Sequence, residues 1–90
     1  MLLPYNESVH DLLKDRLQEI RGYANLSAEQ FGNLIGVTRQ SINNMESGRT
    51  PITKCTCIAI CAVLDGLAER DPMLKLRIEK LLYDTCGFYF

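Results

Sequence analysis

Four polar side chains in the segment TRQSINN have the chemistry to contact nucleobases. They are Arg39, Gln40, Asn43 and Asn44. Arginine can donate two hydrogen bonds to guanine, and glutamine or asparagine can pair with adenine through both ends of the amide. Asparagine is a poor helix former, so two in succession inside a predicted helix favour a role in recognition. The alternative is an ordinary solvated helix face.

Two short helices joined by a tight turn are expected to position these side chains. Ser27 and Gln30 have the spacing of a capping box, which predicts the start of the first helix. Gly36 should end it, because glycine adopts the left-handed backbone of a helix end without a Cβ clash. The apolar residues of this helix share one face and are expected to be buried: Phe31, Leu34 and Ile35.

The second short helix is predicted to begin after Thr38, whose hydroxyl suits an N-cap. Ile42 and Met45 are three residues apart and should face the core. Gly48 should close this helix as Gly36 closes the first. The polar side chains then lie on the face that the core does not cover.

The segment 26–49 resembles the helix-turn-helix of the Cro/C1 (XRE-type) transcriptional regulator family. The family pattern is filled without a gap by Leu26, Ser27, Phe31, Gly32, Ile35, Gly36, Val37, Thr38, Ile42, Met45, Glu46, Gly48 and Arg49. A looser similarity extends from about residue 12 to residue 64. The resemblance implies an all-α, five-helix lambda-repressor-like fold in which the second of the two helices enters the major groove.

By position in the family motif, the resemblance implies base contacts from Arg39, Gln40 and Asn44, with Asn43 next. It implies contacts to the DNA backbone from a second set: Ser27, Thr38, Ser41 and Arg49. Arg21 is expected to pair with Glu46, as a structural clamp rather than a contact to DNA. Gly32 is expected to allow close approach of the chain at the turn.

Three further helices are predicted around this pair. The first should begin at Ser8, extend to about Ala24 and end at a left-handed Asn25. A helix capped by Thr53 should extend to about Leu64, where Asp65-Gly66 should either end it or make a short bend through Arg70. The apolar residues expected to face the core in that helix are Cys57, Ile58, Ile60, Cys61 and Leu64.

The last predicted helix starts at Asp71 and Pro72 and stops at Gly87. Its apolar stripe comprises Leu74, Ile78, Leu81 and Leu82, widened by Met73, Leu76 and Tyr83. A helix this apolar, followed by Phe88-Tyr89-Phe90, suits contact with a second copy. We therefore divide the chain into a helix-turn-helix domain at 1–70, with the motif at 27–47, and a dimerisation element at 71–90. The alternative for 71–90 is packing within the chain only.

The charge of the chain is weakly acidic, with a formal net charge of −1. Residues 38–54 nevertheless carry three basic groups against one acidic group, a local balance of +2. Because phosphate neutralisation supplies much of DNA affinity, we expect modest, salt-sensitive binding by one copy and stronger binding by two.

Several functional classes have little support in the sequence. The single histidine, His10, has no nucleophile–base grouping near it, so we expect no enzyme and no cofactor. The four cysteines lack the paired spacing of a zinc site, and we interpret them as small buried hydrophobes; a redox or metal switch is the alternative. No secretory signal and no membrane-spanning run is recognised, so a cytoplasmic protein is expected.

Two functions follow as hypotheses. The first is a small transcriptional regulator, most simply a repressor, binding double-stranded DNA as a homodimer at two half-sites about 34–36 Å apart. The second is a protein-interaction module on the same fold, which recruits a protein partner through the C-terminal helix and aromatic tail.

Overall fold

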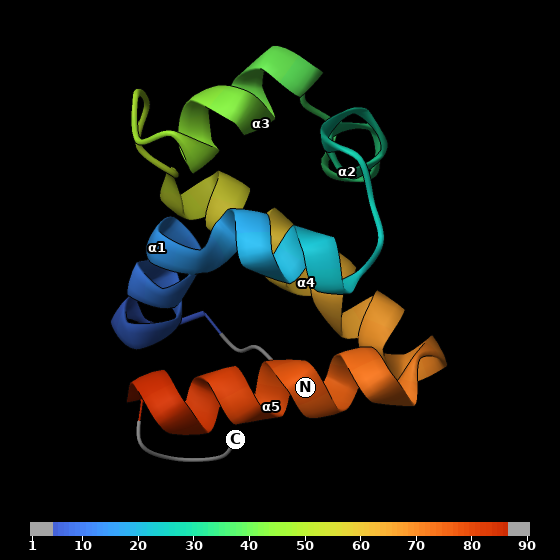
Figure 1. Ribbon diagram of the computed structural model, residues 1–90. Coiled ribbons are helices and arrows are strands. Elements are labelled where there is room, and N and C mark those ends of the chain that lie inside the picture. Colours follow the sequence, from blue (N-terminus) through green and yellow to red (C-terminus); the bar gives the residue numbers. More distant parts are fainter. Residues whose placement is uncertain (1–4, 87–90) are drawn as a thin grey trace.

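Five α-helices account for the secondary structure of residues 5–86, the part of the chain that the computed structural model describes (Figure 1). Their bounds are α1 Glu7–Tyr23, α2 Ala28–Ile35, α3 Arg39–Glu46, α4 Lys54–Arg70 and α5 Pro72–Cys86. The predicted all-α, five-helix fold is confirmed. The predicted stop at Gly87 and the three terminal aromatics lie outside the described residues.

The helices are arranged with α3 and α5 on opposite sides of the molecule. Figure 1 shows α1 and α4 crossing between them, with α2 beside α3. In agreement with this view, α3 packs against α2 and α1, whereas α5 packs against α1 and α4. The two central helices therefore support two outer surfaces that point away from each other.

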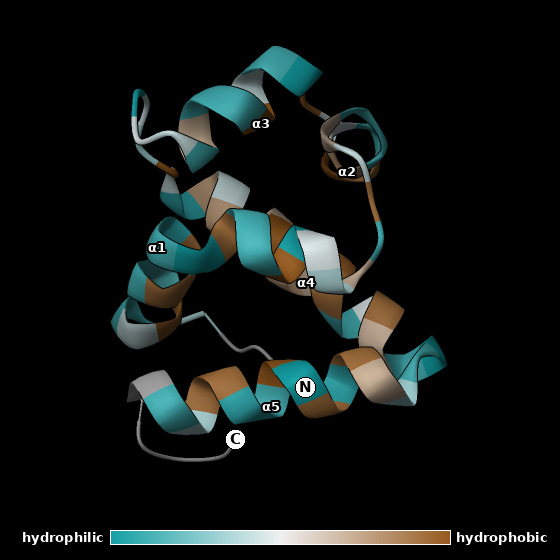
Figure 2. Cartoon of the chain, in the orientation of Figure 1, coloured by the Kyte–Doolittle hydropathy of each residue, from teal (hydrophilic) through white to brown (hydrophobic). Residues whose placement is uncertain are grey.

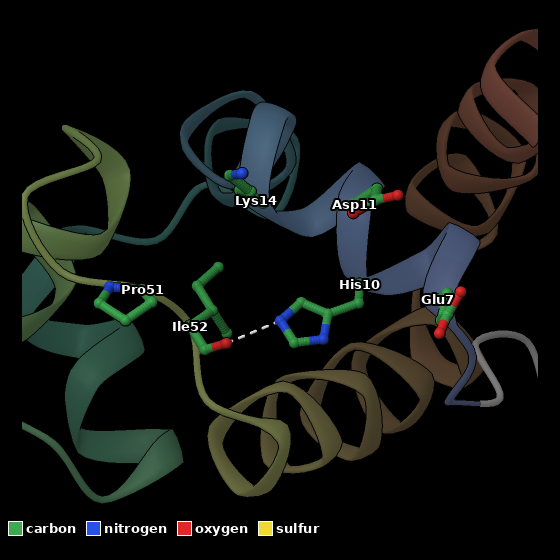
Figure 3. Close-up of a pocket in the computed structure, with 6 residues that line it drawn as sticks. All are labelled: Glu7, His10, Asp11, Lys14, Pro51 and Ile52. Atoms are coloured by element: carbon green, nitrogen blue, oxygen red, sulfur yellow. Dashed lines mark hydrogen bonds between the residues drawn. The ribbon is translucent and has the colours of Figure 1, made fainter.

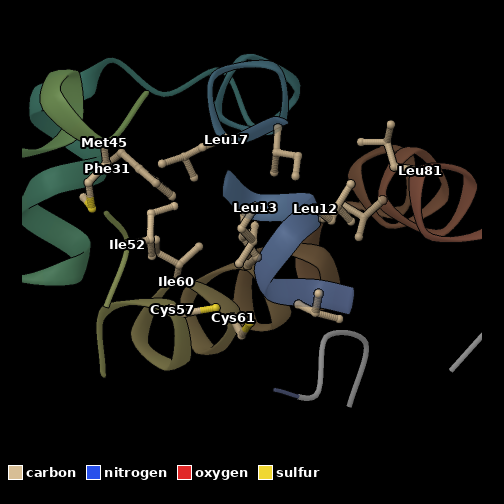
Figure 4. Packing of buried hydrophobic residues seen from close by; sticks show 14 of the residues in the cluster. Leu12, Leu13, Leu17, Phe31, Met45, Ile52, Cys57, Ile60, Cys61 and Leu81 are labelled. Carbon is tan, nitrogen blue, oxygen red and sulfur yellow. The ribbon is translucent and has the colours of Figure 1, made fainter. Parts of the chain in front are cut away.

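One hydrophobic cluster fills the space between the helices (Figure 4). The largest of its fully buried side chains are Phe31, Leu12, Leu13, Leu17, Ile20, Ile42, Ile60, Leu64, Leu74, Ile78 and Leu82. The brown apolar segments of Figure 2 alternate with teal polar ones along each helix, as expected for helices with one face in the core. Among the described residues, no polar or charged side chain is fully buried.

Side-chain capping sets the starts of the helices as the sequence predicts. The Ser27 hydroxyl accepts from the Gln30 N–H at 3.1 Å while the Gln30 side chain accepts from the Ser27 N–H at 2.9 Å, which completes the capping box. Thr38 and Thr53 cap α3 and α4 in the same way, by accepting from the backbone three residues on. Asp71 accepts from the first turn of α5.

Three residues adopt the left-handed backbone at helix ends. Gly36 has φ of 93°, Gly48 has φ of 81°, and Asn25 has φ of 58°. All three predictions are confirmed. Asn25 is the only non-glycine residue with positive φ among those described, consistent with the tolerance of asparagine for this conformation.

The bounds of two helices differ from the prediction. The N-cap of α1 is Asn6, whose side chain accepts from the Val9 N–H at 2.8 Å, so the helix begins before Ser8. Helix α4 continues without a bend to Arg70. Gly66 costs a helix interior about 1 kcal/mol relative to alanine, but the next turn buries Ala68 against the core and offsets that cost.

Two apolar side chains expected to face the core, Leu34 and Ile58, are exposed instead. Met73, Leu76 and Tyr83, which widen the apolar stripe of α5, are exposed as well, on the helix expected to leave surface for a partner. The buried faces of α2 and α4 are narrower than the sequence pattern suggests. In α4, for example, the buried residues Cys57, Ile60, Cys61 and Leu64 form one stripe that leaves Ile58 to one side.

Helix α1 changes direction at Arg16, which has non-helical backbone angles of φ −125° and ψ 16°. The side chains before and after this residue, Leu13 and Leu17, are both fully buried. The change of direction therefore lets both halves of α1 keep their apolar face on the core.

Candidate nucleic-acid interface

The outward face of α3 carries the side chains that the sequence proposed for base contacts. We use the name α3 face for Arg39, Gln40, Asn43 and Asn44. Arg39, Gln40 and Asn43 are exposed and Asn44 is partly buried. On the opposite face of the same helix, Ile42 is 0% and Met45 7% exposed. The helix is thus fixed by its apolar side, and the α3 face is open to solvent at Arg39, Gln40 and Asn43.

Two of these side chains are already paired with each other. The Gln40 side-chain amide Nε2 donates to the Asn44 Oδ1 across 3.1 Å, one helical turn away. The Gln40 carbonyl oxygen and the Asn44 amide N–H groups remain available. The pair therefore presents a carbonyl oxygen that can accept from the N6 amino group of adenine and amide N–H groups that can donate to its N7 in the major groove.

Hydroxyl groups cluster at the start of α3. The Thr38 hydroxyl donates to the Ser41 hydroxyl at 3.0 Å and also accepts from the Ser41 N–H at 3.1 Å. Thr38 is exposed and Ser41 partly buried. Ser27, at the start of α2, is exposed as well, with its hydroxyl oxygen engaged in the capping box. All three residues lie at the first turn of a helix, where free backbone N–H groups favour phosphate.

The tight turn between α2 and α3 depends on Gly32. A Cβ at this position would lie 2.6 Å from the backbone oxygen of Val37, closer than real Cβ atoms approach. The N–H groups of Gly36 and Val37 both donate to the Gly32 carbonyl, at 2.8 and 2.9 Å. The chain can cross over α2 at this point because no side chain separates the two segments.

The far end of α3 is held by an ion pair between Arg21 and Glu46. Arg21 Nε donates to Glu46 Oε2 at 2.6 Å and Nη2 donates to Oε1 at 3.1 Å, a bidentate geometry. A third bond joins Arg21 Nη1 to the Leu26 carbonyl at 2.9 Å. The hydrogen bond that Arg21 donates to the Glu46 carboxylate raises the pKa of Arg21 above its ordinary value.

This arrangement has two effects on the candidate interface. One guanidinium fixes the end of α3 to α1 through the ion pair that the family resemblance implied, and to the segment before α2 through a hydrogen bond that it did not imply. It also pairs the one carboxylate of the helix with a cation. The remaining charge of α3, that of Arg39, can then act on an anionic partner without opposition from Glu46.

The loop after α3 is secured by a contact that the sequence did not reveal. His10 Nε2 lies 2.7 Å from the carbonyl oxygen of Ile52, which can only accept, so this nitrogen carries the proton (Figure 3). In the neutral ring Nδ1 then accepts from the Tyr5 hydroxyl, 3.2 Å away. Forty-two residues separate His10 from Ile52, and no local spacing pattern could indicate their contact.

Arg49 is exposed in this loop, and its backbone N–H donates to the Asn44 carbonyl at 2.9 Å. The hydrogen bond places the residue directly beyond the α3 face. Of the eight candidate contact residues, seven therefore belong to α3, its cap or the loop after it, and Ser27 lies at the start of the preceding helix.

The buried cysteines are part of the core. Cys57 is 0% and Cys61 4% exposed, and both are free thiols, as is the exposed Cys55. Burial raises the pKa of Cys57 and raises that of Cys61 to about 12. Within residues 5–86, no group of three or more histidine, cysteine or acidic side chains could hold a metal ion.

Two short capped helices joined by a tight turn that requires glycine, with the polar side of the second helix exposed, are typical of one class of protein. This class is the helix-turn-helix DNA-binding domains. The family model described as helix-turn-helix matches residues 17–69, more than half of the chain. The protein belongs to this family, the Cro/C1-type helix-turn-helix proteins, which are DNA-binding regulators and not enzymes. No curated protein and no solved structure matches the chain.

None of the helices of residues 5–86 has the length and apolar character needed to cross a bilayer.

Proposed function

We propose that the protein binds double-stranded DNA sequence-specifically through the α3 face. In this proposal it acts in the cytoplasm as a small transcriptional regulator, a repressor, that binds an operator of two half-sites as a homodimer. The observation that carries the proposal is the exposure of Arg39 and Gln40 on a helix whose other side is fully packed. Because the packed side of the helix fixes its backbone, only the side chains themselves have to be ordered when they contact a base edge.

Each candidate residue has a proposed role. Base contacts are assigned to Arg39, Gln40, Asn43 and Asn44, of which arginine suits guanine and the amides suit adenine. Contacts to the DNA backbone are assigned to Ser27, Thr38, Ser41 and Arg49. The first set sits on one helix face, and the second surrounds that face, as expected when phosphate contacts position the helix and base contacts specify the sequence.

The proposed division of the chain is by role, since one hydrophobic core joins all five helices. Residues 1–70 form the helix-turn-helix domain, with the motif at 27–47, and residues 71–90 form the dimerisation element. Support comes from α5, which carries three exposed apolar side chains on the side away from α1 and α4. The same exposed side chains favour the second candidate function, recruitment of a different protein through α5.

The experiment that tests the proposed function is selection of bound sequences from a random duplex pool at moderate salt. We expect the wild type to enrich a defined motif. Arg39→Ala should lose preference at one position of that motif, whereas Arg70→Ala, an exposed arginine at the far end of α4, should leave the motif unchanged. A pool that shows no enrichment would reject DNA recognition and favour the protein-interaction module.

A further inference from the structure

Two thiols lie next to each other on the buried face of α4. Cys57 and Cys61 are four residues apart, about one helical turn, and are 0% and 4% exposed. Figure 4 shows both sulfur atoms on the side of α4 that faces the hydrophobic cluster. The Cys61 thiol donates a hydrogen bond to the sulfur of Cys57, so the two sulfur atoms point toward each other. We call these two residues the dithiol pair.

The spacing of the dithiol pair disfavours a disulfide. Side chains four residues apart on a helix have Cβ atoms about 5–6 Å apart, whereas a disulfide needs Cβ atoms about 3.5–4.5 Å apart. Helix α4 is regular through this turn, where the Cys57 N–H donates to the Thr53 carbonyl at 2.8 Å. Direct oxidation would therefore have to distort the helix. A single atom held between the two sulfurs lengthens the bridge and removes the mismatch.

The charge of the surroundings restricts which atom can be held there. Burial raises the pKa of Cys57 and raises that of Cys61 to about 12, and the Asp65 carboxylate also opposes negative charge on Cys61. A charged complex would be costly in this environment. Two thiolates around Cu⁺ carry a net negative charge. Zn²⁺ takes four ligands, and no group of three or more candidate ligands occurs within residues 5–86.

We propose that the dithiol pair is a binding site for trivalent arsenic, taken up as arsenous acid. Two As–S bonds form and two As–O bonds break, and the proton of each thiol leaves with one hydroxyl group as water. Arsenic keeps its third hydroxyl group and its oxidation state, so the step needs no oxidant or reductant. The complex is neutral and therefore suits a buried site. Cys61 is 4% exposed and gives the ligand its way in.

The site lies beside the loop that follows α3. The Cys57 N–H is bonded to the Thr53 carbonyl at the start of α4, and the residue before Thr53 is Ile52, which is 5% exposed and accepts from His10. Because the interior is close-packed, an additional atom at Cys57 should displace this loop, which carries Arg49. We therefore expect arsenic to weaken duplex binding. This consequence rests on the proposed DNA binding, whereas the site itself does not.

Native mass spectrometry during titration with arsenite, in an excess of glutathione, tests the site. Cys55→Ser/Cys86→Ser removes the other two cysteines of the chain and is the matched control. We expect it to bind one arsenic per chain. In that background Cys57→Ala and Cys61→Ala should each bind about 100-fold more weakly or less, because the second thiol no longer adds its effective concentration. Glutathione competes for arsenic held by one thiol alone.

Two measurements on the control protein need no change in the core. X-ray absorption at the arsenic edge should count two sulfur neighbours and one oxygen neighbour. Circular dichroism should show the same helix content with and without arsenic, which places the ligand in the folded chain. Treatment of the folded protein with oxidised glutathione, followed by peptide mapping, should yield no disulfide between Cys57 and Cys61.

Fluorescence anisotropy with a labelled duplex of the selected motif tests the effect on DNA. Arsenite should weaken binding by the Cys55→Ser/Cys86→Ser protein about fivefold or more, the fold-change that overpacking of a core typically produces. The same protein with Cys61→Ala should bind the duplex equally well with and without arsenite.

The outcomes separate this inference from the proposed function. Undiminished arsenic binding in both alanine variants, three sulfur neighbours, or loss of helix on binding would overturn the site. Ready formation of the disulfide in the folded protein would overturn the argument from spacing. Arsenic binding with unchanged duplex affinity would reject the effect on DNA. Failure of every protein to bind any duplex would reject DNA recognition, while mass spectrometry would still decide the arsenic site.

Discussion

At the scale of single residues, Arg39 and Arg49 are expected to have different roles in DNA binding. Arg39 lies on the α3 face, where a guanidinium can donate two bonds to one guanine. Arg49 is exposed in the loop beyond that face, where the proposed complex brings its charge to the phosphate chain. One residue should therefore affect sequence preference and the other should affect overall attraction.

Alanine substitution separates the two roles. Arg39→Ala should weaken binding to the selected motif by about 1–3 kcal/mol and relax preference at one base pair. Arg49→Ala should weaken binding to all duplexes similarly. It should also reduce the slope of log K against log salt concentration by about the amount that one phosphate contact contributes. Mobility-shift titrations on matched and mismatched duplexes at several salt concentrations measure both effects. Wild-type behaviour in both variants would refute the contact assignment.

The hydrogen bond between Gln40 and Asn44 predicts that the two residues act together on one part of the motif. Loss of either amide removes the partner that orients the other, so Gln40→Ala and Asn44→Ala should each cost most of what the double variant costs. A double-mutant cycle on the selected duplex measures this, and we expect a coupling of about 0.5 kcal/mol or more. Strictly additive losses would show that each side chain contacts DNA independently.

At the scale of the helices, the α2–α3 turn is the element least tolerant of a side chain. Gly32→Leu should lower the free energy of unfolding by about 3 kcal/mol or more, since the clash is with backbone rather than with a movable side chain. Gly22→Leu is the matched control, because a Cβ there meets nothing within 4 Å. Urea denaturation compares the two variants with the wild type. Equal stability of the two variants would show that the chain does not approach α2 most closely at Gly32.

The three cysteines of α4 are expected to differ in the reactivity of their thiols. Cys55 is exposed, whereas Cys57 and Cys61 face the core and have pKa values raised by burial. Since the thiolate is the reactive form, alkylation at neutral pH should modify Cys55 first and the two buried thiols only as fast as the helix opens. Peptide mass spectrometry over time measures each site. Rapid modification of Cys61 in the folded protein would contradict its burial.

The helices also show how far local sequence chemistry determines this structure. The capping box of Ser27, the threonine caps and the left-handed Asn25 depend on a few adjacent residues, and all were predictable. The extension of α4 past Gly66 and the exposure of Leu34 depend on what packs nearby, which propensity does not contain. For the same reason the contact of His10 with Ile52 could not be predicted.

At the scale of the whole molecule, the net charge of −1 restricts how the protein can bind DNA. Non-specific attraction to phosphate must be small for one copy, because few cations lie near the α3 face. We expect the affinity for an unselected duplex to be weak and to fall only gradually as salt rises, because few phosphates are neutralised, while the selected motif keeps stronger binding through its base contacts. Titration of both duplexes against salt checks this, and equal affinities at every salt concentration would contradict it.

The family match covers residues 17–69 and stops before α5 begins at Pro72. Because α5 packs against α1 and α4, on the side remote from α3, we expect substitutions of its exposed residues Met73 and Leu76 to leave the proposed DNA contacts of α3 unchanged. The surface proposed for DNA and the outer surface of α5 can therefore change independently of each other.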